Sequence, residues 1–358
     1  MIRVYDQIFT EEDAKAAYDV VKSGFLSSGP KTIELEEQFA KWTHRKFALA
    51  CCNGTAALSM AVCGLNIVND RVAVPACSFA ATAYAALEQR NHVEFIDVDP
   101  NTWNISIEKL EHACVKWLYT DPIKCVIAVH NLGNPYDYDG LVRLSHRFGF
   151  CIIEDACEAL CARYNGKLTG ALGDISVFSF YGNKLLSSGE GGMVLTDSET
   201  AYNAMKLYRG QGQTAERKFW HVARGTNFRL TNLQSAIVLS QFGRVEDIQS
   251  RKIEILKMYQ SCIPSHVKMQ TQLNNCEHSW WMIGVVAPDD SQYYAETSAR
   301  MTKNGVETRP IFPPMPDMPI FKCEADIQIS RMLYRHGILL PSGITLTNDE
   351  IKYICSLL

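Results

Sequence analysis

Short apolar runs alternate with stretches of helical periodicity through about the first 200 residues, and this alternation limits the folds open to the chain. Each run has the length of a buried strand, and most are followed by a helix-like stretch. Strands joined by helices pair in parallel, so the pattern predicts an α/β fold with a mostly parallel sheet flanked by helices. The seven predicted strands are residues 48–51, 71–75, 93–98, 125–129, 150–154, 175–180 and 193–196.

The pattern changes in the last third of the chain. Residues 235–256 have Ile, Val and Leu at helical spacing and predict one long helix. Beyond it, residues 280–287 and 305–311 predict strands of a separate unit. A chain of 358 residues is expected to form one large domain and one smaller domain. We therefore predict a large domain over residues 1–240 and a smaller C-terminal α+β domain over residues 241–358.

Charge and composition argue against several classes of protein. The net charge is −4 and no basic run stands out, so no nucleic-acid partner is expected. The 13 cysteines lack the paired spacing of a zinc site, which predicts buried reduced thiols and no metal. The sequence has no stretch of about 18 apolar residues and no apolar secretion signal at its start. These features predict a cytoplasmic protein that does not enter a membrane.

One lysine, Lys184, follows the predicted strand at residues 175–180 and precedes a glycine-rich run at residues 189–192. Small neighbours at the end of a strand allow a ligand to approach closely. Lysine forms Schiff bases with aldehydes, and its amine can then move protons. Most lysines in such turns lie on the surface, so a role for Lys184 depends on the residues that accompany it.

Asp155 comes directly after the predicted strand at residues 150–154. Ligands of open α/β folds bind at the carboxyl ends of the strands, which is where Asp155 is expected. A buried carboxylate needs a cationic partner, and a protonated pyridine nitrogen is one. The alternative interpretation is that Asp155 caps a helix.

Two further turns carry residues suited to a flat, phosphorylated ligand. Gly54 and Thr55 open a predicted helix, whose free N–H groups favour a phosphate. Phe79 begins the next predicted helix, where an aromatic ring can stack on a flat cofactor. Each signal is weak alone, because an ordinary turn or a phenylalanine of the core can occur in a similar sequence.

These residues form one set, which in chain order is a phosphate-binding turn, an aromatic ring, a carboxylate and a lysine. With this set the sequence resembles a known family. It is similar to the DegT-type sugar aminotransferases, which have the aspartate aminotransferase (type I) fold and use pyridoxal 5′-phosphate (PLP). The resemblance extends from residue 29 to about residue 309. Its motifs are Asn-Gly-Thr-Ala-Ala-Leu at 53–58, Phe-Ala-Ala-Thr at 79–82, Glu-Asp-Ala at 154–156, Ser-Phe-Tyr-Gly-Asn-Lys at 179–184, Gly-Glu-Gly-Gly at 189–192 and Gly-Thr-Asn-Phe-Arg at 225–229.

The resemblance implies a role for each motif residue. The implied roles are phosphate binding by Gly54, Thr55 and Ser179, ring stacking by Phe79, pairing of Asp155 with the pyridine nitrogen, a place for Glu158 near the ring hydroxyl, and a Schiff base with Lys184. Asn227 is implied to reach the phosphate in the neighbouring subunit, so that a homodimer shares its active sites. The family often has glutamine or histidine at the position of Glu158, whose carboxyl is therefore expected to be protonated or displaced.

The resemblance also implies a reaction. L-glutamate is the expected amino donor, and Lys184 is expected to act as the general base and acid. The Gly-Asn-Lys sequence at residues 182–184 resembles enzymes that aminate C4 of dTDP- or GDP-linked 4-keto-6-deoxyhexoses, of the perosamine and viosamine kinds. Arg309, beside a proline-rich loop, is a candidate for binding the diphosphate of the sugar nucleotide.

Several alternatives stay open at this point. A PLP-dependent sugar 3-aminotransferase or a dehydratase would have the same fold, and a non-catalytic regulatory relative would retain it. Some related dehydratases have histidine in place of the lysine, so Lys184 favours transamination. A regulator is disfavoured because no helix-turn-helix with a basic face is evident. A Rossmann dehydrogenase is disfavoured because no Gly-x-Gly-x-x-Gly follows the first strand.

Overall fold

The computed structural model describes residues 1–27, 29–214, 216–290 and 292–358. Its largest element is a seven-stranded sheet with the strand order β1-β9-β8-β5-β4-β2-β3. The strands are β1 (Phe47–Cys51), β2 (Arg71–Pro75), β3 (His92–Ile96), β4 (Ile123–Val129), β5 (Cys151–Asp155), β8 (Ile175–Ser179) and β9 (Gly192–Thr196).

The sheet is parallel except at β9, which pairs antiparallel with β1 and β8. The prediction of a mostly parallel seven-stranded sheet is therefore confirmed. Parallel neighbours need a crossover connection, which is why helices separate most of these strands in the sequence. One consequence is that the carboxyl ends of β2, β4, β5 and β8 meet at the same edge of the sheet.

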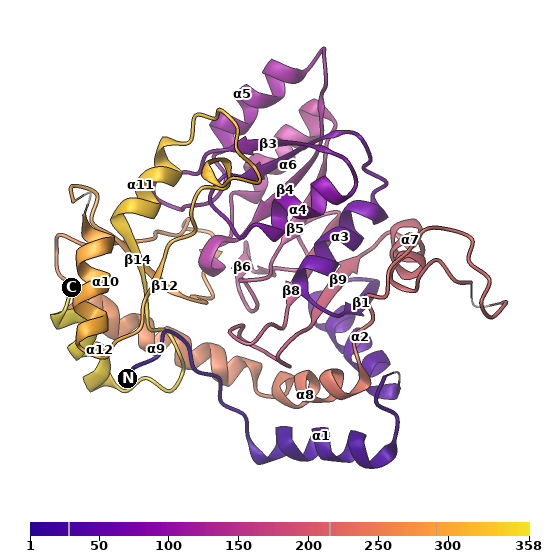
Figure 1. Ribbon diagram of the computed structural model, residues 1–358, viewed down its shortest axis with the longest axis horizontal. Helices are drawn as coiled ribbons and strands as arrows, with labels where there is room; N and C mark the ends of the chain where they lie inside the picture. The colour runs from indigo at the N-terminus through magenta and orange to yellow at the C-terminus, as the bar shows by residue number, and fades with distance from the viewer. Residues whose placement is uncertain (28, 215, 291) are drawn as a thin grey trace.

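Helices cover both faces of this sheet (Figure 1). Alternate residues of β1 show the two faces: Leu49 packs in the core that includes α3, whereas Ala48 packs in the core that includes α2. Both faces are therefore buried, as expected of a parallel sheet. The helices of this part are α1 (Glu11–Ser23), α2 (Pro30–Thr43), α3 (Gly54–Gly64), α4 (Ala81–Glu88), α5 (Ile107–Trp117), α6 (Tyr138–Phe148) and α7 (Glu199–Arg209).

The single long helix predicted over residues 235–256 is wrong, because two helices occupy this region. They are α8 (Asn232–Phe242) and α9 (Val245–Cys262). Gly243, which follows α8, is a poor helix former. Arg244 leaves the helical conformation with a φ of −120°, and its side chain pairs with the buried Asp13 of α1. The break therefore coincides with a long-range ion pair that a helical pattern does not reveal.

A second, antiparallel sheet forms the C-terminal unit, with the strand order β10-β12-β14-β13. The predicted strands at residues 280–287 and 305–311 correspond to shorter strands in it. The domain boundary near residue 240 stays a prediction. The elements of this unit are β10 (Lys268–Met269), β12 (Ile283–Val286), α10 (Tyr293–Lys303), β13 (Arg309–Pro310), α11 (Gln328–His336), β14 (Gly337–Leu340) and α12 (Asn348–Ser356). A third small sheet joins β6 (Arg163–Tyr164), β7 (Lys167–Leu168) and β11 (Cys276–Glu277).

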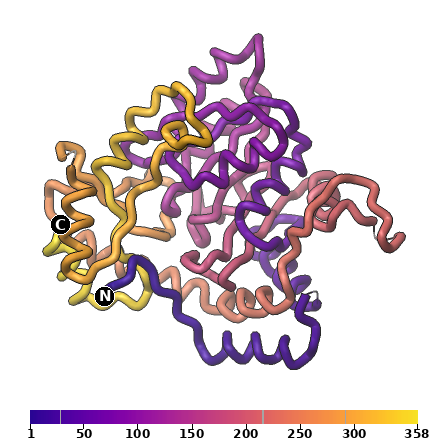
Figure 2. Tube along the Cα trace, viewed as in Figure 1, coloured from indigo at the N-terminus to yellow at the C-terminus, as the bar shows by residue number. Residues whose placement is uncertain are grey.

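The N-terminal residues lie against the C-terminal unit rather than beside the helices that follow them (Figure 2). The N–H of Ile2 donates to the carbonyl of Gly305 at 2.8 Å, and the N–H of Ser342 donates to the carbonyl of Val4 at 2.8 Å. The hydroxyl of Tyr5 then donates to the carbonyl of Lys184 at 2.9 Å. The start of the chain therefore connects the second sheet with the loop that follows β8.

Within the described ranges, no helix is long and apolar enough to cross a membrane. The cytoplasmic location expected from the sequence stays a prediction.

Candidate active site

A cavity of about 650 Å³ opens at the carboxyl edge of the parallel strands. Loops after β2, β5 and β8 line one side of it, and residues of the C-terminal unit line the other. The structure brings eight of the nine predicted site residues into this lining, namely Gly54, Thr55, Phe79, Asp155, Glu158, Ser179, Lys184 and Arg309.

The turn before α3 forms a small cradle for an anion. Asn53 caps the helix, because its side chain accepts the N–H of Ala56 at 2.8 Å. The N–H groups at the start of a helix have no partner within it and carry partial positive charge. A Cβ at Gly54 would lie 3.0 Å from the Cβ of Ser179 and 3.1 Å from the sulfur of Cys157. A side chain at position 54 would therefore crowd the gap between the helix start and the end of β8.

Asp155 is the last residue of β5, and its buried carboxylate lines the cavity. Its Oδ2 accepts the hydroxyl of Thr82 at 3.1 Å, and its Oδ1 accepts the N–H of Cys157 at 3.2 Å. No described residue forms an ion pair with this carboxylate, although a buried negative charge requires a cation. The arrangement therefore favours a cationic ligand group beside Asp155.

Phe79 projects into the cavity instead of the core. Its side chain is 61% exposed, whereas a core phenylalanine would be buried. The prediction that Phe79 begins a helix is wrong, because α4 starts at Ala81 and the carbonyl of Phe79 accepts the N–H of Thr82 in a preceding turn. This turn leaves the ring free to contact a flat ligand. The ring meets that of Phe312, which also lines the cavity, edge-on at 6.3 Å between centroids.

The amine of Lys184 lies deep in the cavity, 3.7 Å from Oε1 of Glu158. The other carboxyl oxygen of Glu158 accepts the N–H of Leu132 at 2.9 Å. Burial raises the pKa of Glu158 to about 7, against the opposing effect of the Lys184 ammonium. Close to neutral pH, this carboxyl therefore exists in both its protonated and its ionised form.

We expect this raised pKa to make stability depend on pH. A carboxyl whose pKa is higher in the folded state stabilises the fold below its ordinary pKa, and this contribution is lost as the pH rises through about 7. The Glu158→Gln protein lacks the titrating group. The unfolding temperature of the cofactor-free protein should therefore fall between pH 5 and pH 8, and this fall should be a few degrees larger for the original chain than for Glu158→Gln. Equal falls in both proteins would contradict a raised pKa.

Glu154, the neighbour of Asp155, does not line the cavity, and its hydrogen bonds stabilise the fold instead. Burial alone would raise its pKa, but hydrogen bonds hold the pKa below its usual value, with His130 the leading contributor. The partners of its two oxygens are His130 Nε2, the N–H groups of Gly170, Leu172 and Gly173, and the hydroxyl of Ser176. This network fixes the end of β5 and with it the backbone of Asp155.

Two of the nine predicted residues, Arg309 and Asn227, are exposed rather than buried in the site. Arg309 is exposed at the mouth of the cavity, where its guanidinium is 3.9 Å from Glu307. Asn227 is exposed and lies outside the cavity lining of its own chain. It bridges to Gly210, and the carbonyl of its neighbour Phe228 accepts the N–H of Cys52.

Thr82 and Trp281 contact predicted site residues, but sequence reasoning assigned neither of them to the site. Thr82 is the last residue of the Phe-Ala-Ala-Thr motif at residues 79–82, but its hydrogen bond to Asp155 depends on how the turn after β2 folds. Trp281 lay inside a predicted strand, and nothing in the local pattern distinguishes it from Trp280. In the structure, the ring centroid of Trp281 is 3.7 Å from the amine of Lys184.

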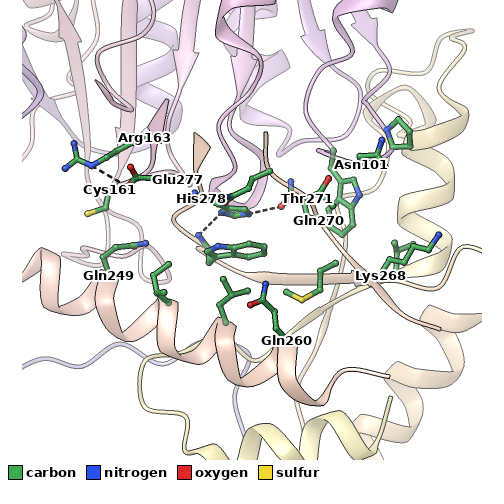
Figure 3. A pocket seen from close by; sticks show the side chains of 18 of the residues that line it. Asn101, Cys161, Arg163, Gln249, Gln260, Lys268, Gln270, Thr271, Glu277 and His278 are labelled. Atoms are coloured by element: carbon green, nitrogen blue, oxygen red, sulfur yellow. Dashed lines mark hydrogen bonds and ion pairs between the residues drawn. The ribbon is translucent and has the colours of Figure 1, made fainter. Parts of the chain in front are cut away.

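A second cavity, of about 1070 Å³, lies between α9 and the segment at residues 268–280 and contains none of the predicted site residues (Figure 3). The ring of His278 stacks on Trp280 at 3.8 Å and contacts Gln270 through Nε2 at 3.0 Å. Burial lowers the pKa of His278 well below its ordinary value, so the ring is neutral. Trp280 therefore faces this cavity, and its neighbour Trp281 faces the first one.

Comparison with known proteins identifies the family. The model of the DegT/DnrJ/EryC1/StrS aminotransferase family matches residues 7–358. The chain belongs to this family. As a DegT/DnrJ/EryC1/StrS member it is an aminotransferase, and the family predicted from the motifs is confirmed.

Named relatives of this family member match it along nearly its whole length. It is 34% identical over 357 residues to the GDP-perosamine synthase of Escherichia coli O157:H7, which covers 99% of this chain and 96% of the relative. It is 32% identical over 365 residues to the GDP-perosamine synthase of Vibrio cholerae, covering 99% and 98%. Among solved structures, the E. coli GDP-4-keto-6-deoxy-D-mannose-3-dehydratase with bound hydrated PLP has a TM-score of 0.92 at 24% identity, covering 100% of this chain and 99% of that one. This likeness confirms the predicted fold.

Proposed function

We propose that this aminotransferase uses PLP to transfer the amino group of L-glutamate to C4 of a GDP-linked 4-keto-6-deoxyhexose. The observation that carries the proposal is the full-length similarity to two GDP-perosamine synthases. The sequence does not settle which nucleotide carries the sugar, and the names of these relatives favour GDP. The product would be a 4-amino-4,6-dideoxy sugar nucleotide.

The residues lining the cavity fit PLP. The space left by Gly54, beside the start of α3 and the Ser179 hydroxyl, suits a phosphate. The Asp155 carboxylate, which has no cationic partner among the described residues, suits a protonated pyridine nitrogen. Phe79 offers a ring face, and the Lys184 amine lies in the same cavity. When bound, PLP supplies an aldehyde that bonds to amines and a ring that delocalises negative charge.

The side chains of the chain would then perform the proton transfers. Lys184 Nζ would move a proton from Cα of glutamate to C4′ of the cofactor in the first half of the reaction, and from C4′ to C4 of the sugar in the second. Asp155 would keep the pyridine nitrogen protonated, because its charge favours the cationic form. Arg309, at the mouth of the cavity, would bind the diphosphate of the sugar nucleotide.

A dehydratase is the main alternative, since one has the same fold. That likeness concerns the fold alone. Lys184 favours transamination, because the sequence keeps an amine where some related dehydratases have histidine.

A panel of acceptors distinguishes these functions. The purified chain would be incubated with PLP, L-glutamate and one of three 4-keto-6-deoxyhexoses linked to GDP, dTDP or UDP. We expect 2-oxoglutarate and an amino sugar in equal amounts, with the GDP-linked acceptor preferred. Nuclear magnetic resonance of the product would distinguish C4 from C3. A product that has lost its C3 hydroxyl, or no transfer to any acceptor, would contradict the proposal.

We further propose that two chains form a homodimer with shared active sites. Residues 216–226, which precede Asn227 in the sequence, belong to an arm that extends from the body of the protein after α7 (Figure 1). The arm exposes Phe219 to 84%, and Trp220 and Val222 are also exposed. Large apolar side chains gathered in one projecting segment are typical of a surface that another chain covers. Asn227 would thereby reach the cofactor phosphate of the partner, where its amide can donate hydrogen bonds.

This proposal predicts complementation between two inactive proteins. Lys184→Ala and Asn227→Asp should each be inactive alone, the second because an added carboxylate repels a phosphate. If Asn227 serves the partner's site, one site of a mixed dimer carries both changes and the other carries neither. Mixing the proteins should therefore restore up to about a quarter of the original activity, on the assumption of random exchange and two independent sites. No recovery despite demonstrated subunit exchange would place Asn227 outside the partner's site.

A further inference from the structure

The amine of Lys184 contacts two groups of its own chain. It lies 3.7 Å from the ring centroid of Trp281 and 3.7 Å from Oε1 of Glu158. The face of an indole ring attracts an ammonium group, and a carboxylate attracts it further. The two contacts come from different parts of the chain, Glu158 after β5 and Trp281 before β12. Together they hold the amine at one place on the cavity wall.

Trp281 is itself fixed by contacts at both its side chain and its backbone. Its Nε1–H donates to the carbonyl of Asn183 at 2.7 Å, one residue before Lys184. Its own carbonyl accepts a hydrogen bond from the amine of Lys252 at 2.9 Å. With the residue 6% exposed, the ring has little freedom to turn away from Lys184. The ring and the lysine are therefore positioned relative to each other through the Asn183 carbonyl.

Lys252 fixes the backbone of Trp281 through the hydrogen bond to its carbonyl. The side chain is fully buried on α9, where its amine also donates to the carbonyl of Ser342. Burial lowers its pKa to about 7, and the amine can donate both hydrogen bonds in either protonation state. A buried amine that joins α9 to the residues before β12 and after β14 serves to fix the Trp281 backbone.

We propose that Trp281 and Glu158 form a seat that the Lys184 amine occupies whenever it is not bonded to the cofactor, and that Lys252 is a positioning residue for this seat. Transamination requires Lys184 to leave the cofactor carbon and return to it in each half of the reaction. A seat keeps the free amine inside the cavity during that interval, so it does not have to be recovered from solvent. The inference rests on Lys184 as the reacting amine, but not on which sugar accepts the amino group.

Trp280 provides a matched control for Trp281. The two residues are adjacent and equally buried at 6%, so their substitution removes comparable apolar contacts. The ring of Trp280, however, stacks on His278 in the second cavity. A change at Trp280 therefore tests for general damage to this segment, and a change at Trp281 tests the seat.

The experiment measures the reactivity of the Lys184 amine rather than enzyme turnover. The cofactor-free chain is labelled at pH 7 with trace acetic anhydride, and the acetylated fraction of Lys184 is measured by mass spectrometry relative to Lys31 and Lys46. We expect Trp281→Leu to increase the relative labelling of Lys184 about three- to tenfold, because the ring that covers and attracts the ammonium is lost. Trp281→Phe, which keeps a ring but loses the bond to Asn183, should give a smaller increase. Trp280→Leu should change it less than twofold.

Lys252→Met tests, in the same assay, whether Lys252 positions Trp281. The methionine side chain fills a similar space but cannot bond the two carbonyls, so Trp281 should loosen and Lys184 labelling should rise about twofold or more. Lys257→Met, an exposed change on the same helix, should leave the labelling unchanged. Equal labelling in Lys252→Met and Lys257→Met would remove Lys252 from the proposal.

One outcome would overturn the seat itself. Labelling of Lys184 that is the same in Trp281→Leu and Trp280→Leu would show that the ring does not hold the amine. If Trp281→Leu fails to fold, the comparison of Trp281→Phe with Trp280→Phe decides the question in the same way. Because no substrate is used, failure here would leave the proposed sugar substrate untouched, and failure of the acceptor panel would leave the seat untouched.

Discussion

The Lys184→Ala protein is expected to bind PLP but to lose turnover by about four orders of magnitude or more. The cradle at Gly54 and the carboxylate of Asp155 do not depend on the lysine, so the cofactor should still bind. Both the bond to the cofactor and the proton transfer require the amine, and no other described lysine lines the cavity. Steady-state amino transfer and equilibrium dialysis of PLP measure the two effects separately.

Lys167→Ala is a suitable control, because Lys167 is exposed on β7 and should retain full activity when changed. Turnover of the Lys184→Ala protein within about tenfold of the original rate would contradict the assigned role of Lys184.

The Asp155→Asn protein is expected to lose about two to three orders of magnitude of activity and to bind PLP more weakly. The amide has the shape of the carboxylate and can still accept the N–H of Cys157, so the turn should persist. It lacks the charge that would hold a proton on the pyridine nitrogen. The measurement is the rate of the half-reaction with glutamate, followed by the absorption of the cofactor, together with the dissociation constant of PLP.

Asp137→Asn separates the loss of a local cap from the loss of a charge in the cavity. Asp137 caps α6 by accepting the N–H of Gly140, and it lies outside the cavity lining. This substitution should lower the free energy of unfolding by at most about 1 kcal/mol and leave the rate of the half-reaction with glutamate unaltered. If Asp155→Asn behaves in the same way, Asp155 is a structural cap only.

Much of the fold followed from the sequence because a parallel sheet buries both faces of its strands. Each strand then has to be a continuous apolar run, and the predicted residues 71–75 coincide with β2 while other strands differ by a few residues at their ends. Asp155 was found because a polar side chain stands out directly after such a run, and Lys184 because it lies between a run and a glycine-rich segment. Their gathering in one cavity follows from parallel strands that end at the same edge.

What the sequence did not reveal depends on contacts between distant residues. The break after α8 coincides with the pair between Arg244 and Asp13, which are 231 positions apart. The place of Trp281 over Lys184 depends on how the C-terminal unit docks against the loop after β8. Local periodicity carries no information on such contacts, because it records only which face of an element is buried.

The path of the first residues affects when the site can form during synthesis. Val4 is bonded to Ser342, and Tyr5 is bonded to Lys184, so the start of the chain has no complete set of contacts until nearly all of the chain has left the ribosome. Contacts of such long sequence separation form slowly, because a large loop must close before they stabilise anything. The seven-stranded sheet can assemble earlier, since its strands all precede residue 197. We therefore expect nascent chains halted before residue 340 to hold a formed sheet but an N-terminal segment that proteases still cut.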